Sequence, residues 1–332
     1  MTDMKKEVSR QMIAGLGSAL VDVLAKEDDH FLQSISDIKG GMTLVANEFI
    51  EDVCRKLTGD PLIVPGGAAC NTIIGIGRLG GKARFVAKRG KDRMGTFFED
   101  DLRNNNVEPC LSHSDSPNGR VLSIITPDAQ RSMFTCLGAA AELSPGDITD
   151  ECFKGAAIVL IEAYLLYNSP SPVMAAIAAA RKAGARIAMD LSSFTVVQDF
   201  KKLLENEIVP DVDILIANED EARAFTGYSE EDMAINALSA KAEIAVLKIG
   251  KRGSYIAHQG QVIHIPPMGD GAAADTTGAG DLWAAGFLYG LVNGYPLEKC
   301  GEIASACGYE VCQVVGAKIP EDGWDRIKKL LI

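Results

Sequence analysis

Apolar and polar residues alternate with a different rhythm in each half of the chain. From about Ile158 onward, short β-branched runs alternate with alanine-rich stretches of helical period, and Gly184 follows the stretch 169–183. This rhythm is typical of βαβ units on a parallel sheet, and a glycine at such a point commonly ends a helix. The pattern continues through 185–191, 212–218, 242–250, 253–259 and 261–267 to a long apolar stretch, for which we predict a helix over Leu282–Asn293.

The first half contains strand-like runs separated by turn residues. We predict strands, joined by turns rather than by helices, over Gly40–Phe49, Pro61–Pro65, Arg120–Thr126 and Arg131–Cys136. Pro127, Asp128 and Ala129 are typical of a hairpin connection. Because the sequence has no internal repeat or glycine/serine linker, we expect this small β subdomain to be integral to one domain.

The composition is that of an ordinary globular protein. The 332 residues are 47% hydrophobic and 23% charged, which excludes a disordered or collagen-like chain. This length fits either about two units of ~150 residues or one large α/β domain with an appendage. With 33 Lys and Arg against 45 Asp and Glu, the formal charge is −12.

Targeting and membrane signals are not evident. The charge-free stretch 163–180 is interrupted by Asn168 and two prolines, and the stretch 282–297 is too short to span a bilayer. The N-terminus has no apolar run of signal-peptide length. We therefore expect a cytoplasmic protein without a membrane partner.

Eight cysteines are scattered along the chain at positions 54, 70, 110, 136, 152, 300, 307 and 312. They form no CxxC pair and have no histidine cluster beside them, which argues against a zinc site and against a disulfide framework. We expect reduced thiols that are mostly buried.

Two local patterns have an ordinary structural explanation. GIGRLG at 75–80 satisfies the dinucleotide pattern GxGxxG, but it follows a helical stretch rather than a strand, so we expect close helix packing there. Lys and Arg residues concentrate in 82–93 with Phe85 as the only aromatic residue among them. We expect a solvated face at 82–93 and no nucleic-acid partner.

The segment DTTGAGD, 275–281, leads directly into the apolar helix. Small residues let the backbone approach a ligand closely, and the amides of Gly278, Ala279, Gly280 and Asp281 lie at a helix N-terminus, where the dipole favours an anion. A carboxylate at Asp281 suits a base that takes a proton from an attacking hydroxyl. An ordinary capped helix start is the alternative, but seven matching residues favour a phosphate site.

DTTGAGD resembles the second signature of the ribokinase-like (PfkB) carbohydrate and nucleoside kinases. The segment 66–71, GGAACN, is similar to the first signature of that family, and NEDE at 218–221 is similar to its NxxE motif. The resemblance implies a three-layer α/β/α fold with a mostly parallel sheet and a small β lid. It places the whole chain, 1–332, in one kinase domain, with the lid formed by about 22–37, 41–66 and 117–138.

Within the family, the chain is most similar to adenosine kinases. Residues 15–32 resemble their opening segment, with Ser18 where an asparagine is expected. The resemblance implies that Asp22 binds the ribose hydroxyls of the substrate. A carboxylate can accept the two hydrogen bonds that a vicinal diol offers. Residues 118–140 are also similar, which implies that Arg131 reaches from the lid toward the transferred phosphate.

The remaining site residues are implied by the same resemblance. Besides Asp22, substrate contacts are expected from Ser18, Gly67, Asn71, Met133, Leu137 and Phe194, the last by stacking on the base. ATP contacts are expected from Asn218, Lys248, Gly250, Gly253 and Thr276, and Glu221 is expected to place Mg²⁺ indirectly. The implied cofactors are ATP and Mg²⁺, with a monovalent cation such as K⁺ as a further candidate.

The sequence therefore predicts transfer of the ATP γ-phosphoryl group to the primary 5′-hydroxyl of a nucleoside, and adenosine is the first choice of acceptor. A ribokinase- or fructokinase-type sugar kinase is the alternative, and a non-catalytic nucleoside sensor on the same fold is an alternative of another class. An oxidoreductase would rest on GIGRLG alone. We expect small-molecule partners and a monomer or homodimer.

Overall fold

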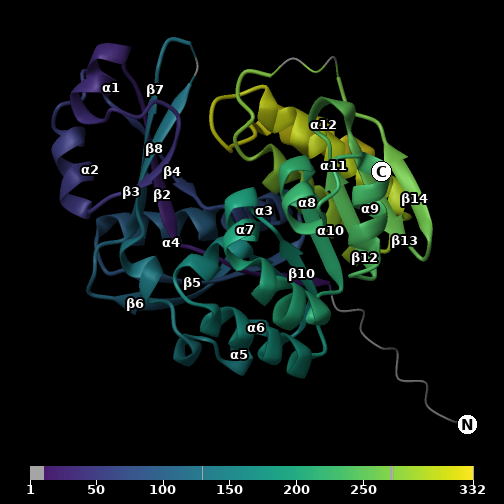
Figure 1. Ribbon diagram of the computed structural model, residues 1–332. Helices are drawn as coiled ribbons and strands as arrows, with labels where there is room; N and C mark the ends of the chain where they lie inside the picture. Colours follow the sequence, from purple (N-terminus) through teal and green to yellow (C-terminus); the bar gives the residue numbers. More distant parts are fainter. Residues whose placement is uncertain (1–10, 129, 270, 272, 332) are drawn as a thin grey trace, which may run out of the picture.

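The computed structural model describes residues 11–128, 130–269, 271 and 273–331. Its larger part is built on a nine-stranded sheet in the order β14-β13-β12-β11-β10-β9-β1-β5-β6 (Figure 1). From β12 to β6 in that order, neighbouring strands are parallel; β13 pairs antiparallel with β12, and β14 pairs antiparallel with β13. Their bounds are β1 Met12–Leu16, β5 Lys82–Gly90, β6 Val107–Ser114, β9 Ala156–Glu162, β10 Arg186–Asp190, β11 Ile214–Asn218, β12 Ile244–Lys248, β13 Ser254–His258 and β14 Gln261–Ile265.

Helices bury this sheet on both faces. The side chains of consecutive strand residues lie on opposite faces of the sheet, and each face has its own apolar cluster. Ile13 and Leu160 belong to one cluster, and Ala14 and Ile161 belong to the other. A sheet covered on both sides needs continuously apolar strands, which explains the runs in the sequence. One face carries α3 Ala68–Arg78, α4 Arg93–Asn104, α10 Ala279–Val292, α11 Leu297–Cys312 and α12 Glu321–Lys328; the other carries α5 Asp150–Phe153, α6 Pro170–Ala183, α7 Phe194–Leu203, α8 Glu219–Thr226 and α9 Glu231–Ser239.

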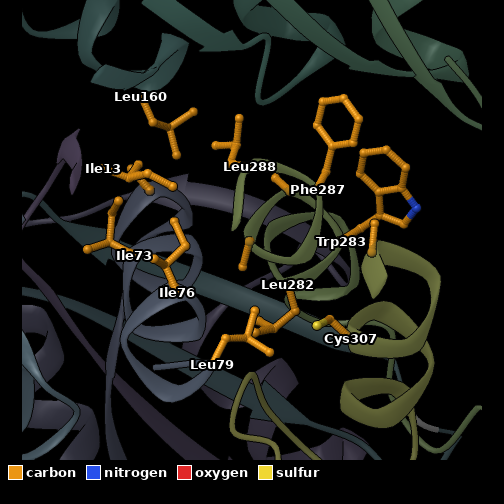
Figure 2. Packing of buried hydrophobic residues seen from close by; sticks show 14 of the residues in the cluster. Ile13, Ile73, Ile76, Leu79, Leu160, Leu282, Trp283, Phe287, Leu288 and Cys307 are labelled. Atoms are coloured by element: carbon orange, nitrogen blue, oxygen red, sulfur yellow. The ribbon is translucent and has the colours of Figure 1, made fainter. Parts of the chain in front are cut away.

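The helices α3 and α10 pack tightly against each other. Figure 2 shows apolar side chains of both, among them Ile76 and Leu282, in one cluster. In GIGRLG, Gly75 permits this approach, because a Cβ there would lie 2.7 Å from the Ala285 Cβ of α10. Gly77 permits a second close approach, to the Asn105 carbonyl that follows α4. The segment is helical, so the prediction of helix packing is confirmed.

A second sheet has five strands in the order β3-β8-β7-β2-β4. Its strands are β2 Leu20–Lys26, β3 Gly41–Leu44, β4 Leu62–Gly66, β7 Gly119–Ile125 and β8 Arg131–Cys136. One face, with Val23, Leu122 and Phe134, is covered by α1 Asp29–Ile35 and α2 Asn47–Cys54. We call this sheet with α1 and α2 the lid; Figure 1 shows it beside the larger sheet.

The sequence prediction of a lid without helices is wrong. The strand expected over Gly40–Phe49 ends at Leu44, and α2 begins at Asn47. Ile50 and Val53, three positions apart, are both buried on one side of α2, as the apolar face of a helix requires. The strands β7 and β8 pair antiparallel as predicted, while Ala129 of the expected connection lies outside the described residues.

The basic segment 82–93 is only in part the solvated face that we expected, since Lys82, Lys91 and Arg93 are exposed and the other three basic residues are not. The side chains of Arg84, Lys88 and Arg89 are at most 15% exposed. They form ion pairs with Glu108 at 2.9 Å, with Asp147 at 3.1 Å and with Glu99 at 2.6 Å, respectively. These positive charges therefore hold neighbouring elements together.

The cysteines and the membrane prediction have plain outcomes. All eight cysteines are free thiols, and Cys54, Cys110 and Cys312 are partly exposed while the other five are buried. Among the described residues, no helix has both the length and the apolar character that crossing a membrane requires. The expected absence of a signal peptide falls on residues 1–10, outside the described part.

Candidate active site

The first turn of α10 is built on a glycine that no other residue could replace without strain. Gly278 precedes the helix with φ +75°, and a Cβ there would lie 2.6 Å from the Ala317 Cβ. Ala279, Gly280 and Asp281 follow, and the Ala279 amide donates to the Thr276 carbonyl at 3.2 Å. The positive end of the helix dipole therefore lies at this loop.

Asp281 is held by residues of α3. The Asn71 Nδ2 donates to the Asp281 Oδ2 at 2.9 Å, and the Thr72 hydroxyl donates to the Asp281 carbonyl at 3.0 Å. Burial raises the pKa of Asp281 to about 7; the Asn71 hydrogen bond opposes this shift and the Asp190 charge adds to it. A carboxylate with this pKa can accept a proton near neutral pH.

A buried lysine lies beside the same turn. Lys248, at the end of β12, donates from Nζ to the Asp190 Oδ2 at 3.0 Å, and a Cβ on Gly280 would lie 3.0 Å from that Nζ. Burial by itself would lower the pKa of Lys248, but the charges of Asp190 and Glu221 raise it above its ordinary value. The lysine therefore stays charged next to the N-terminus of α10. Sequence reasoning did not find Asp190.

Asn218 and Glu221 form a reciprocal cap at the start of α8. The Asn218 Oδ1 accepts from the Glu221 amide at 2.9 Å, while the Glu221 carboxylate accepts from the Asn218 amide at 2.8 Å and from its Nδ2 at 2.7 Å. Burial, and then repulsion by Asp190, raises the pKa of Glu221 to about 7. Among the described residues no group of three or more His, Cys, Asp or Glu is placed to hold a metal ion. The expected indirect placement of Mg²⁺ by Glu221 stays a prediction.

One cavity of about 430 Å³ brings together the residues predicted to contact ATP. Its lining includes Asn218, Lys248, Gly250, Gly253 and Thr276. Gly253 has φ +99° and a Cβ there would clash with the Ile265 carbonyl, so the turn between β12 and β13 requires glycine. Gly280 lies on the same cavity, which connects it to the first turn of α10.

The double glycine 66–67 brings a loop against Asp22 and Ser18. A Cβ on Gly66 would clash with the Asp22 carboxylate, and Gly67 has φ +101° with its Cβ position 2.7 Å from the Ser18 carbonyl. Burial raises the pKa of Asp22 to about 6, and the positive charge of Arg131 opposes this shift. The two signatures of the sequence therefore meet, since Asn71 follows this loop and contacts Asp281.

Glu162 joins the two loops and was missed by sequence reasoning. It ends β9, is 2% exposed, and accepts from the Ser18 amide at 2.8 Å and from the Ala69 amide at 2.9 Å. Burial raises the pKa of Glu162, and the two amide hydrogen bonds oppose the shift. The only signal in the sequence was an acidic residue at the end of an apolar strand.

Arg131 connects the lid to the DTTGAGD loop. Its Nη2 donates to the Asp275 Oδ2 at 2.7 Å and its Nη1 donates to the Thr277 hydroxyl. A second cavity, of about 1340 Å³, lies between Arg131 and Met133 of the lid and residues 273–277. Both cavities reach Thr276, so the lid and the nucleotide side meet at this loop.

Leu137 and Phe194 lie apart from these cavities. Leu137 follows β8 directly, and its carbonyl lies 2.7 Å from the position that a Cβ on Gly119 would take. Phe194 begins α7 and is 46% exposed. Among the described residues, the linings of the two cavities include neither side chain. Their roles in substrate binding stay predictions.

Known proteins share both the sequence and the fold. Residues 38–323 match the family described as pfkB family carbohydrate kinase. A 5-dehydro-2-deoxygluconokinase from Geobacillus thermodenitrificans is 30% identical over 256 residues, which cover 73% of this chain and 76% of that protein. A probable sugar kinase from Rhizobium etli has a TM-score of 0.87 at 29% identity, covering 97% of this chain and 99% of its own. An adenosine kinase from Sinorhizobium meliloti has a TM-score of 0.85 at 30% identity, covering 97% and 100%.

These likenesses extend over nearly the whole chain, including the small sheet. They confirm the predicted α/β architecture, in which helices flank a large, mostly parallel sheet and a second small sheet lies beside it.

Proposed function

Because this chain belongs to the pfkB family of carbohydrate kinases, phosphotransferases that act on a sugar or nucleoside hydroxyl, we propose that it transfers the γ-phosphoryl group of ATP to the 5′-hydroxyl of a nucleoside, adenosine first. The observation that carries the proposal is the position of Asp281. Its carboxylate is hydrogen-bonded to Asn71 of the first signature, and its helix turn lies on the nucleotide cavity through Gly280.

In the proposed mechanism, Asp281 accepts the proton of the acceptor hydroxyl as that oxygen attacks the γ-phosphorus. The amides of Gly278, Ala279, Gly280 and Asp281 stabilise the negative charge that develops on the phosphoryl oxygens. Arg131, now bound to Asp275, moves to the transferred phosphate from the lid, and lid closure excludes water.

The nucleotide is held on the other side of that turn. The ammonium of Lys248 supplies a positive charge beside Gly280, and Gly250 and Gly253 let the backbone approach ATP. Asn218 would bind phosphate, and Glu221 would hold Mg²⁺ through water. A Mg²⁺ ion held there would supply positive charge to the phosphates of the nucleotide. A monovalent cation stays a candidate cofactor.

The open face of the lid sheet supports a nucleoside as acceptor. Register places Val64 and Val121 beside Asp22, so that the carboxylate lies among apolar neighbours on that face. Met42 is paired with Met133 on the same sheet and is 48% exposed. An apolar face beside a carboxylate suits a ligand with one flat apolar end and one diol end.

A sugar kinase is the second candidate. It is favoured by the likeness to a protein named 5-dehydro-2-deoxygluconokinase and to a structure titled a probable sugar kinase. Ser18, where an adenosine kinase is expected to have asparagine, also favours a different acceptor. The geometry around Asp281 serves either reaction.

The test is release of ADP from ATP with adenosine, other nucleosides, ribose, fructose or sugar phosphates as acceptor. The assays are repeated without Mg²⁺ and with K⁺ replaced by Na⁺. Adenosine-dependent release with formation of the 5′-monophosphate supports the nucleoside kinase. A response to a sugar alone overturns the acceptor and keeps the mechanism. No ADP release with any acceptor, despite nucleoside binding, favours a sensor.

We further propose a cytoplasmic location, which cell fractionation tests, and a monomer or homodimer, which light scattering tests.

A further inference from the structure

Two cysteines outside the candidate active site face each other. The Sγ atoms of Cys110 in β6 and Cys152 in α5 are 3.2 Å apart. A disulfide requires about 2.05 Å, so the two sulfurs need to approach by about 1 Å for a bond to form. Cys110 is partly exposed, which gives a small oxidant access to the pair, while Cys152 is 2% exposed.

One arginine holds both segments in place. Arg84, on β5, donates to the Cys152 carbonyl at 3.2 Å and pairs with Glu108, two residues before Cys110, at 2.9 Å. The Thr149 amide and hydroxyl each lie 3.4 Å from the Cys152 Sγ. The thiols are therefore kept in contact by groups that do not need to move.

The two thiols are also chemically unequal. The hydrogen bond with Cys110 lowers the pKa of Cys152 to about 6; burial opposes this shift, and Thr149 and the Arg84 charge assist it. The same hydrogen bond and burial raise the pKa of Cys110, with Glu108 adding to the shift. One member of the pair thus ionises readily, and the thiolate is the form that oxidants attack.

We propose that Cys110 and Cys152 are a modification site at which a peroxide produces a reversible disulfide. The thiolate of one cysteine of the pair attacks one peroxide oxygen, the O–O bond breaks, and a sulfenic acid forms while hydroxide leaves. The sulfur of the other cysteine then attacks the sulfenic sulfur, the S–O bond breaks and water leaves. In sum, two thiols and one hydrogen peroxide give one disulfide and two waters. A dithiol reductant reverses the reaction.

The bond would close a loop that contains two of the five strands of the lid. The chain between Cys110 and Cys152 includes β7, β8 and Arg131. Joining the two ends of this segment restricts the unfolded chain, so the oxidised protein unfolds at a higher temperature than the reduced one. This inference does not depend on the proposed acceptor or on the kinase mechanism.

The experiment treats the full chain with hydrogen peroxide and counts thiols after denaturation. We expect the eight free thiols to fall by two. Non-reducing peptide mapping should find the Cys110 peptide joined to the Cys152 peptide, and dithiothreitol should restore both thiols. The oxidised protein should also melt several degrees higher.

Matched variants separate this pair from general oxidation. In Cys110→Ser and in Cys152→Ser, the cross-link between these two positions should not form. Cys54→Ser, which removes another partly exposed cysteine, should leave the cross-link intact. The proposal is overturned if wild-type protein keeps all its thiols, or if mapping finds Cys110 or Cys152 joined to another cysteine. Mapping on wild type decides the matter even where a variant does not fold.

Discussion

The ionisation of Asp281 controls the proposed chemistry at the scale of single residues. A base acts only when it is deprotonated, and burial raises the pKa of this carboxyl to about 7. We therefore predict that kcat/KM is constant at alkaline pH and falls below about pH 7, by about tenfold per pH unit well below the pKa. The pH profile of the best acceptor checks this. An acid limb centred near the ordinary pKa of a carboxyl would contradict it.

Two neighbours should move this acid limb in opposite directions. The negative charge of Asp190 raises the pKa of Asp281, whereas the positive charge of Lys248 lowers it. Asp190→Asn should therefore shift the acid limb to lower pH, and Lys248→Met should shift it to higher pH and weaken ATP binding. Shifts in the same direction in both variants would exclude this assignment of the charges.

Glu162 should act on acceptor binding through the two loops that it holds. Both of its oxygens accept backbone amides, but a glutamine in its place could accept only one and would bring its own N–H to the other. Glu162→Gln should lower kcat/KM for the acceptor by about 5- to 150-fold, from the ~1–3 kcal/mol of an unsatisfied buried group, with little change in the KM for ATP. Glu151→Gln, at a carboxylate that is 73% exposed, is the matched control. If Glu162→Gln changed the KM for ATP as much as it changed kcat/KM for the acceptor, the role of Glu162 would not be confined to the acceptor side.

At the scale of elements, the close approach of β4 to β2 depends on Gly66. A Cβ on Gly66 would clash with the Asp22 carboxylate, so Gly66→Ala should displace Asp22 and lower acceptor kcat/KM by up to about 10²-fold. Gly59→Ala is the control, since a Cβ at Gly59 meets no atom within 4 Å. Steady-state kinetics with a thermal melt tests the pair. Wild-type kinetics in Gly66→Ala would contradict the assignment of Asp22 to the acceptor site.

The sequence predicted the elements whose pattern is local. The apolar strands of the second half and the glycine turn before α10 could be predicted directly, because period and glycine spacing determine them. The lid helix α2 was missed because the strand-like run that ends at Leu44 was extended to Phe49. Ile50 and Val53, three positions apart, have the spacing of a helix face.

Residues defined by distant contacts also escaped prediction. Glu162 meets Ser18 across 144 positions of sequence, and Asp190 meets Lys248 across 58. A single sequence contains no local pattern for such pairs. The basic segment 82–93 was misread for the same reason, since Asp147, the partner of Lys88, lies 59 positions away.

At the scale of the whole molecule, the account requires the lid and the large sheet to act together. Arg131 joins them through Asp275 and Thr277. We predict that Arg131→Met lowers acceptor-dependent turnover by about 10²- to 10³-fold, the usual cost of losing one charge-stabilising donor. Hydrogen exchange in β7 and β8 should increase, because the lid loses its bond to the loop.

A control arginine lies on the same lid. Arg120 forms its ion pair with Glu51 inside the lid, so Arg120→Met should leave turnover near the wild-type value. Equal losses in both variants would indicate that lid stability, rather than the link to the DTTGAGD loop, limits the reaction.

The most direct test of the central claim compares wild-type protein with Asp281→Asn. Acceptor-dependent ADP release is measured with the best acceptor, and ATP binding is measured by calorimetry on the same samples. We predict that the variant binds ATP as the wild type does and loses about 10²- to 10⁴-fold in turnover. Turnover near the wild-type value, with ATP bound normally, would contradict the assignment of Asp281 as the base.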